Sequence, residues 1–569
     1  MNGIVRMIGA IKLPARKPHK DSLRELVETI VFVVVLVLIL KLFVVEAFVI
    51  PTGSMAETLF GYHKTVQCEQ CGYEFPVNSS EEEEGRKETG KVPIVGYHCP
   101  NCDFPGKLKL NELASGRDKY FRTELTSDNG DRVLVHKAMR IDHRGSVVVF
   151  KFPKDPQVDH VAQNYIKRLV GFGGETIAVY HGKLFVHQSL TYPADSYPLP
   201  ENPKDLWDRR YTYPLAPNAT AAFEEAKKLG FPESGRGFEL IRKPDDQALA
   251  MMRLVYHNDF QAQDLLKVGI APRWKTSGEG WGPTQGGQKS YAHTGVGRGF
   301  LKYEHLRVPI KSVKDEFTPN TARTRDLSKL PVPTHITNFM GYNSGARGAF
   351  TSPYEGIENS DNNDNWVGDL IVECKADIAG PEASVILDLG RGPNRFQAQF
   401  TNGMVKLIRT GPGGKEIASR PTSMTKADRY DLRFANVDCR LRVWVDGKTI
   451  DFSSEADYPY EVPTKFENTD SKSEGWTMAN DIREPAAIEV QGDVTISSIV
   501  LRRDTYYTHL DSKEAELDTF YVQPGHFLCF GDNSAQSHDG RGWGLVPERL
   551  MLGRAVFTFW PRSRIGFIR

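Results

Sequence analysis

Two residues of this chain, Ser54 and Lys167, lie in sequence contexts that suit a nucleophile and its general base. Ser54 follows Pro51-Thr-Gly, in which Gly53 permits a tight turn, so its hydroxyl is expected to stand exposed. A serine hydroxyl is a poor nucleophile unless a positioned base takes its proton. Lys167 lies among the apolar residues of Tyr165–Val170, and burial there would lower its pKa below the usual value of about 10.4. The neutral Lys167 amine would then accept the Ser54 proton and pass it to the leaving amine.

Neither residue is informative alone, because a turn serine or a solvent-facing strand lysine is far commoner than a catalytic one. Here both belong to a series of four short patterns in one order along the chain. The patterns are Pro51-Thr-Gly-Ser-Met-Ala-Glu-Thr-Leu59, Gly130-Asp-Arg-Val-Leu-Val-His-Lys137, Tyr165-Ile-Lys-Arg-Leu-Val-Gly-Phe-Gly-Gly-Glu175 and Gly531-Asp-Asn-Ser-Ala-Gln-Ser-His-Asp-Gly-Arg-Gly-Trp-Gly-Leu-Val-Pro547. Their combination favours the catalytic interpretation over the structural one.

The four patterns resemble the conserved boxes of bacterial type I signal peptidases, the kind with a single membrane anchor. The resemblance covers roughly 26–70, 128–190 and 518–569, well under half of the chain, but the combined pattern is highly specific. It implies a serine endopeptidase with a Ser–Lys dyad, Ser54 and Lys167, that removes N-terminal signal peptides from exported preproteins without a cofactor. The family cuts after small residues one and three positions before the scissile bond, with the substrate bound as an added β-strand.

The resemblance also assigns supporting residues. The Ser54 backbone N–H and the Thr52 hydroxyl would form the oxyanion hole that stabilises the tetrahedral intermediate. Ser537 would form a hydrogen bond with the Lys167 amine and orient it. The other expected supports are an Asp539–Arg541 salt bridge that holds this loop, and Asp532 and Asn533. Each of these residues has an alternative interpretation as an ordinary turn residue, since Gly-Asp-Asn is common turn chemistry.

The chain departs from the family pattern at four places. The family usually has Pro at Glu57, Gly-x-Pro-Gly-Asp at 171–175 (where Gly173 replaces the proline and Glu175 the aspartate), Arg at Ser534 and Ser at Gly540. None of these changes removes a dyad atom, so we expect the function to survive them.

An apolar segment precedes Ser54. The 20 residues from Leu26 to Val45 are about the number that a helix needs to cross the hydrocarbon core. Basic residues are concentrated on the N-terminal side, which predicts a cytoplasmic N-terminus and a catalytic domain outside. We expect a single-pass protein of the inner (cytoplasmic) membrane, with a basic segment over 1–25 and an anchor over 26–47. A cleavable signal peptide is the alternative, disfavoured by the long flank and the lack of a small-x-small site.

Four of the seven cysteines form two tight pairs, Cys68/Cys71 and Cys99/Cys102. Each pair places two thiols three positions apart beside Gly or Pro, as zinc knuckles do, and four thiolates complete a tetrahedral Zn²⁺ site. We expect this metal to be structural, because a four-cysteine site leaves no open position for catalysis. Disulfides are the alternative in an oxidising compartment, and a redox Cys-x-x-Cys is a third.

The elements that must position these residues are mostly strands. Short β-rich runs alternate with turns over 131–187 and again over 520–569, which is typical of an antiparallel β domain. The expected domains are a catalytic β domain over 48–66, 128–190 and 518–569, a zinc-knuckle-like insert over 67–115, a mixed insert over 190–355 that contains a helix at Asp245–Val268, and a β-sandwich over 356–510. The predicted fold class is therefore mainly β with an N-terminal transmembrane helix.

The predicted sandwich rests on regularly spaced strands, with Asp446-Gly447 as a strong hairpin turn. It resembles concanavalin-like (laminin G-like) jelly rolls, but carries no signature that names a ligand. Cys374 and Cys439 fall in its strands and are interpreted as buried apolar side chains rather than as a pair.

Lys+Arg and Asp+Glu both number 72, so the formal net charge is zero and nucleic acid is not an expected partner. The expected partners are preproteins with signal peptides, the lipid bilayer and the translocation machinery. Two other classes stay open. One is an anchored binding protein that displays the sandwich on a degenerate protease scaffold, which the intact Ser54 and Lys167 disfavour. The other is a self-cleaving repressor-type protein, whose relatives are soluble and bind DNA.

Overall fold

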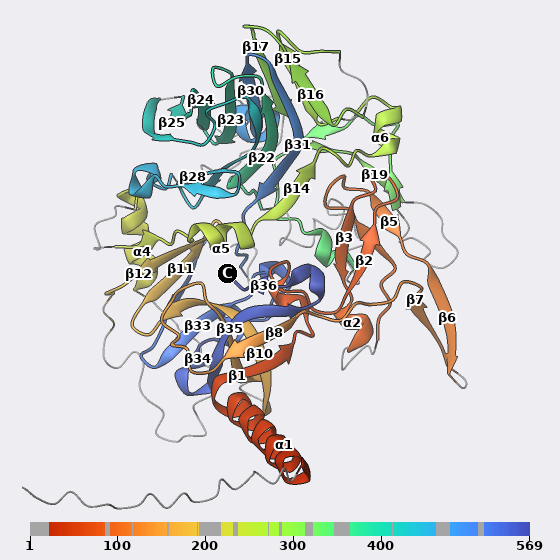
Figure 1. Cartoon of the computed structure of the whole chain (residues 1–569), viewed down its shortest axis with the longest axis vertical. Coiled ribbons are helices and arrows are strands. Elements are labelled where there is room, and N and C mark those ends of the chain that lie inside the picture. Colours follow the sequence, from red (N-terminus) through yellow and green to blue (C-terminus); the bar gives the residue numbers. More distant parts are fainter. Residues whose placement is uncertain are drawn as a thin grey trace, which may run out of the picture.

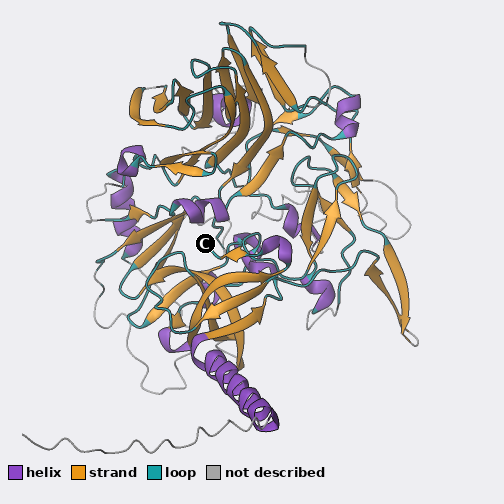
Figure 2. Cartoon of the chain, in the orientation of Figure 1, coloured by secondary structure: helices purple, strands orange, loops and turns teal. Residues whose placement is uncertain are grey.

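The computed structural model describes residues 22–85, 91–115, 118–155, 159–190, 192, 218–231, 237–270, 272–283, 287–312, 323–345, 365–411, 414–461, 478–509 and 517–569. Strands dominate this part of the chain apart from its N-terminal helix (Figure 2), which confirms the mainly β fold class. A β domain lies next to the helix, and a cysteine-containing unit lies beside this β domain (Figure 1). A large β-sandwich lies at the end of the molecule opposite the helix (Figure 1). Most of the predicted basic segment, residues 1–21, lies outside the described residues.

The apolar segment forms α1 (Ser22–Ile39), continued by a π-helical turn at Leu40–Val44. Leu23–Val44 is long and apolar enough to cross a membrane, and none of it is buried against the rest of the protein. The next strand begins at Val45, so the last three residues of the predicted anchor, 45–47, are strand rather than helix.

The domain beside α1 consists of two antiparallel sheets. The larger contains, in spatial order, β1 (Val45–Val49), β8 (Arg132–His136), β35 (Met551–Trp560), β9 (Val147–Asp155), β10 (Asp159–Phe172), β33 (His526–Phe530) and β34 (Val546–Pro547), with β36 (Gly566–Phe567) on β35. The smaller contains β13 (Glu239–Leu240), β12 (Lys183–His187), β11 (Thr176–Tyr180) and β32 (Leu517–Tyr521). The two sheets bring together four parts of the chain: 45–49, 132–187, 239–240 and 517–567.

Strand β10 is an interior strand of the larger sheet. It pairs with β9 on one side, where Lys167 lies opposite Val148, and with β33 on the other, where Arg168 lies opposite Phe530. Because β33 leads into the loop that begins at Gly531, this pairing places the third and fourth sequence patterns next to each other.

The cysteine-containing unit consists of three small hairpins and one short helix. These are β2 (His63–Gln67) with β3 (Glu74–Asn78), β4 (Gly96–His98) with β5 (Pro105–Lys107), β6 (Leu110–Ser115) with β7 (Asp118–Thr123), and α2 (Ser80–Glu83). The two cysteine pairs lie in the turns of the first two hairpins.

The sandwich consists of two seven-stranded sheets around one core. The first contains β14 (Arg253–His257), β31 (Val494–Arg503), β22 (Leu370–Ile378), β27 (Asp428–Val437), β28 (Arg440–Val445) and β29 (Lys448–Ile450), with β16 (Ser290–His293) on β31. The second contains β15 (Trp274–Gly278), β17 (Arg298–Tyr303), β30 (Ala486–Gln491), β23 (Ser384–Arg391), β24 (Asn394–Thr401), β25 (Met404–Thr410) and β26 (Lys415–Pro421).

The sandwich therefore begins about a hundred residues earlier than predicted, because β14 to β17 come from the supposed mixed insert. The predicted helix over Asp245–Val268 is wrong. Two short helices, α5 (Asp245–Ala250) and α6 (Gln263–Lys267), flank β14, whose apolar and aromatic residues pair with β31 instead of continuing a helix.

The remaining described elements are short. They are α4 (Ala219–Lys228), α7 (Gly540–Trp543), β18 (Leu306–Arg307) with β21 (Val332–Pro333), β19 (Ile310–Ser312) with β20 (Arg323–Arg325), a π-helical turn at Met478–Arg483, and 3₁₀ turns that include Gly53–Met55 and Gly341–Gly345.

Candidate active site

The Ser54 hydroxyl and the Lys167 amine meet although they are 113 residues apart. Ser54 lies in the 3₁₀ turn that follows β1, and its Oγ is 2.6 Å from Nζ of Lys167. Lys167 is only 2% exposed, and burial lowers its pKa to about 8, against the opposing attraction of the Asp539 carboxylate. The neutral amine is therefore accessible near neutral pH, and it is within hydrogen-bond distance of the proton that it would have to accept.

The loop after β33 holds the Ser54 turn by its backbone. The Asn533 N–H donates to the Ser54 carbonyl oxygen at 3.1 Å, and Asn533 Nδ2 donates to the Gly53 carbonyl oxygen at 3.0 Å. Asn533 is completely buried, so water does not compete for these hydrogen bonds. Asn533 thus fixes the turn without touching the reacting hydroxyl.

Asp539 and Arg541 form a buried ion pair within the same loop, with Nη2 of Arg541 2.7 Å from Oδ2 of Asp539. Asp539 also accepts the Gly531 N–H at 2.9 Å, which closes the loop on itself. The Asp539 charge lies near Lys167 and moderates the effect of burial on the lysine pKa.

Ser537 and Thr52 are two further predicted site residues. Ser537 is buried, but its Oγ has no hydrogen-bond partner among the described residues, so its expected hydrogen bond with Lys167 is not formed. Its side chain lies against Gly531 instead, where a Cβ would be 2.2 Å from Oγ. Thr52 is exposed and extended directly before the turn. The roles of both residues stay predictions.

Asp532 has a partner that the sequence interpretation did not assign. Arg168 donates to both carboxylate oxygens of Asp532, at 2.7 and 2.5 Å, and both residues are buried. The only sequence signal for Arg168 was its place beside Lys167 in the third pattern. A second missed residue is Asn343, which binds Asn533 from far outside the four patterns.

Three of the departures from the family pattern have local contacts. Glu175 pairs with Arg144 at 2.7 Å and accepts the Phe172 N–H at 2.8 Å. Ser534 accepts hydrogen bonds from the Thr508 N–H at 2.8 Å and from Arg541 at 2.5 Å. A side chain at Gly540 would lie 2.9 Å from the Cys529 carbonyl oxygen, so this position leaves no room for one. The departures are therefore compatible with a packed site.

The four paired cysteines converge on one point. Their Sγ atoms all lie within 4.8 Å of one another, with 3.7 Å between Cys68 and Cys102 and 3.5 Å between Cys71 and Cys99. All seven cysteines are free thiols, so the two cysteine pairs do not form disulfides in this structure. In a tetrahedral Zn²⁺ site with Zn–S bonds of about 2.3 Å, the sulfur atoms would be roughly 3.8 Å apart. The donor set and its dimensions thus fit a four-coordinate metal ion.

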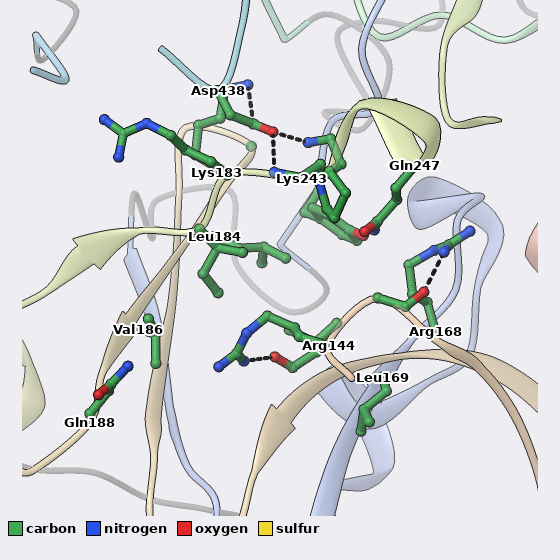
Figure 3. A pocket seen from close by; sticks show the side chains of 17 residues that line it. Arg144, Arg168, Leu169, Lys183, Leu184, Val186, Gln188, Lys243, Gln247 and Asp438 are labelled. Carbon is green, nitrogen blue, oxygen red and sulfur yellow. Dashed lines mark hydrogen bonds and ion pairs between the residues drawn. The ribbon is translucent and has the colours of Figure 1, made fainter. Parts of the chain in front are cut away.

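A separate cluster of three buried aspartates is paired with lysine side chains. Asp369, Asp438 and Asp504 come together at the junction of the sandwich and the smaller sheet of the β domain. The ammonium of Lys243 lies 2.7 Å from Asp438 and 2.8 Å from Asp504, and Lys183 contacts all three carboxylates. Figure 3 shows the Asp438 carboxylate between the two lysines. This cluster is an ion-pair network that joins the sandwich to the β domain.

A cavity of about 320 Å³ lies beside this network (Figure 3). Its wall includes Leu169 and Val170 of β10 and Leu184 and Val186 of β12, whereas Lys167 does not line it. The cavity is therefore separate from the dyad.

Comparison with known proteins identifies two matching segments. Residues 123–213 and 437–560 match the family model described as "Signal peptidase, peptidase S26". Lys167 and the 531–541 loop lie within the matched segments, whereas Ser54 lies outside them.

Similar sequences include a processing peptidase and a signal peptidase. Thylakoidal processing peptidase 1, chloroplastic, of Arabidopsis thaliana is 32% identical over 80 residues, which are 14% of this chain and 23% of that protein. Signal peptidase I of Leptolyngbya laminosa is 50% identical over 45 residues, 8% of this chain and 22% of that protein. The chain thus spans less than a quarter of the length of either relative.

Among solved structures, the carbohydrate-binding module CBM66 from Bacillus subtilis aligns with 40% of this chain and 94% of its own length, at 11% identity and a TM-score of 0.21. A TM-score this low indicates neither a ligand nor a function for the sandwich. The sequence comparisons carry the functional information: two segments of this chain, which hold Lys167 and the loop that supports Ser54, are similar to signal peptidases of the S26 family.

Proposed function

We propose that this protein is a membrane-anchored serine endopeptidase that removes signal peptides from exported preproteins. The observation that carries the proposal is the 2.6 Å distance between Ser54 Oγ and the buried Lys167 Nζ. The similarity of two segments to S26 signal peptidases supports the same chemistry and substrate class.

In the proposed reaction, Ser54 Oγ attacks the scissile carbonyl carbon while the neutral Lys167 amine takes its proton. The tetrahedral intermediate carries an oxyanion, for which the Ser54 N–H and the Thr52 hydroxyl are the proposed donors. Collapse of the intermediate breaks the C–N bond, and the Lys167 ammonium gives its proton to the departing amine. Water then attacks the acyl-enzyme, with Lys167 again as the base, and releases Ser54.

Strand β1 is the proposed docking edge for the substrate. It is the end strand of the larger sheet, where its described pairing is with β8 alone, and it leads directly into the Ser54 turn. An extended peptide that adds to β1 would run past Ser54 Oγ. Because only the π-helical turn Leu40–Val44 separates β1 from α1, such a peptide would lie close to the membrane surface that α1 enters.

We further infer that Cys68, Cys71, Cys99 and Cys102 bind a structural Zn²⁺. The two pairs form matching turns, in which the Gly72 N–H donates to the Cys68 carbonyl oxygen and the Asp103 N–H to that of Cys99, at 2.9 and 2.8 Å. Four thiolates suit Zn²⁺ and leave it no open position, so the ion would support folding rather than catalysis.

The test is cleavage of a signal-peptide-bearing preprotein by the purified full chain in lipid vesicles. Ser54→Ala and Lys167→Ala are each expected to abolish cleavage, because each removes an atom of the dyad. Lys375→Ala is the matched control, since this strand lysine is exposed in the sandwich. Wild-type cleavage by either dyad variant would refute the proposal.

A further inference from the structure

The 3₁₀ turn Gly341–Gly345 comes from the inserted part of the chain, and it packs directly against the nucleophile turn. All five of its residues are buried. The Tyr342 ring stacks on Phe60, with 5.4 Å between the centroids, and a Cβ on Gly53 would lie 2.5 Å from the Tyr342 ring. Gly53 is thus required by this contact, rather than by the turn conformation that the sequence suggested.

Asn343 of this turn forms a reciprocal amide pair with Asn533. Nδ2 of Asn343 donates to Oδ1 of Asn533 at 2.8 Å, and Nδ2 of Asn533 donates to Oδ1 of Asn343 at 2.7 Å. The second hydrogen on the Asn533 amide nitrogen is the one that reaches the Gly53 carbonyl oxygen. The orientation of the Asn533 amide therefore depends on its partner in the insert.

The opposite side of the turn is attached to the second cysteine hairpin. The His98 N–H, one residue before Cys99, donates to Ser344 Oγ at 2.9 Å. A Cβ on Gly341 would lie 2.7 Å from the Pro100 ring, which shows how closely the two backbones approach. The turn is thus fixed on one side by the cysteine unit and holds Asn533 on the other.

We propose that Asn343 is a positioning residue for the Ser54 nucleophile and acts through Asn533. The proposal rests on the function proposed above. Without Asn343, the Asn533 amide would lose two of its three side-chain hydrogen bonds in a site from which water is excluded, and it would be free to turn away from Gly53. The Ser54 turn would then lose one of its two attachments to this loop. A small displacement of a nucleophile is enough to lower the rate of the chemical step by about 100-fold.

The test is the kinetics of preprotein cleavage by the full chain carrying Asn343→Ala, Asn533→Ala or both. Each single variant is expected to lower kcat about 10- to 100-fold and to leave KM within about twofold, because neither residue contacts substrate. The double variant is expected to lose no more than the stronger single one, since both residues act through one contact. A merely structural role would lower the free energy of unfolding and leave the kcat of the folded enzyme unchanged.

Asn343→Asp is the second variant, in case the alanine variant does not fold. It has the same size and keeps the acceptor for Asn533 Nδ2, but loses the donor to Asn533 Oδ1, so its kcat is expected to be intermediate. Asn258→Ala is the control, because Asn258 is also a buried asparagine of the insert, and its hydrogen bond to Gln288 does not involve the Ser54 turn. Its kcat is expected to be that of the wild type.

A folded Asn343 variant with wild-type kcat, or multiplicative losses in the double variant, would overturn the positioning role. The proposed peptidase function is judged separately by Ser54→Ala. If Ser54→Ala still cleaves, the peptidase mechanism fails; if it is inactive while Asn343→Ala is fully active, only the role of Asn343 fails.

Discussion

Arg168 and Asp532 form a buried, two-pronged ion pair, with Nε–Oδ1 and Nη2–Oδ2 distances of 2.7 and 2.5 Å. Arg168 follows Lys167 in β10, and Asp532 precedes Asn533 in the loop that holds the Ser54 turn. One ion pair thus joins the strand that carries the proposed base to the loop that fixes the proposed nucleophile.

Asp532→Asn is expected to destabilise the protein by about 3–5 kcal/mol, because it leaves the buried Arg168 guanidinium without a compensating charge. Chemical unfolding measures this change. Asp377→Asn is the matched control, since Arg429 binds Asp377 in the same two-pronged way on the exposed face of the sandwich, where solvent screens the pair. An equal loss of stability in both variants would show that burial does not govern the strength of these pairs.

The activity should rise with pH through about 8. Lys167 is the base only when neutral, and burial lowers its pKa to about 8. We expect kcat to increase about tenfold per pH unit below that value and to level off above it. Preprotein cleavage measured between pH 6 and 9.5 tests this prediction, and a kcat that does not change over this window would exclude Lys167 as the titrating base.

The same pKa predicts that Lys167 destabilises the folded protein at neutral pH. The folded-state pKa of about 8 is below the unfolded value of about 10.4, so the unfolded state binds more protons between these values and stability rises with pH across this window. Lys167→Met removes the cost of burying the charge and should stabilise the protein by roughly 2–3 kcal/mol at pH 7. The unfolding free energy of this variant at pH 7 and pH 10 measures the effect. The gain should shrink at pH 10, and an equal gain at both pH values would contradict the linkage.

The sequence predicted local elements well where a strand pattern and a turn agreed. Strands β8, β11 and β12 lie within the β-rich region predicted over 131–187, and the predicted turn at Asp446-Gly447 has positive φ at both residues, as a two-residue hairpin requires. Alternation and turn residues are local signals, so one sequence is enough to detect them.

Contacts over long sequence distances could not be predicted in this way. Asn343 is 190 residues from its partner Asn533, and no pattern around Asn343 distinguishes it from other loop asparagines. Likewise, Arg253–His257 became a strand because β31 was available to pair with it. The contact between Ser54 and Lys167 was predictable only because both residues belong to patterns that resemble those of a known family.

Cys71→Ser is expected to abolish metal binding by the cysteine cluster. Three remaining thiolates leave the tetrahedral site incomplete, so zinc measured in the purified protein should fall from about one per chain to near zero. Cys374→Ser is the matched control, because Cys374 is equally buried but lies in the sandwich core, away from the other thiols. Undiminished zinc in Cys71→Ser would refute the proposed site.

The same variant should also lower the thermal midpoint of unfolding, because the ion would no longer hold the two hairpins together. The turn Gly341–Gly345 rests on the second hairpin, so a loss of kcat should accompany the loss of metal. An unchanged kcat in the metal-free protein would show that the cysteine unit does not support the active site.

Lys183 is expected to be essential for the junction between the β domain and the sandwich. It contacts Asp369, Asp438 and Asp504, and with Lys243 and Arg391 it balances their three negative charges. Lys183→Met would leave an uncompensated carboxylate in a buried site, at an expected cost of about 3–5 kcal/mol. Lys406→Met is the matched control, because its pair with Glu416 is exposed and contributes little. Calorimetry measures the effect. Lys183→Met should lower the unfolding midpoint, or should make the β domain and the sandwich unfold in separate transitions. An unchanged single transition would show that this network does not hold the two domains together.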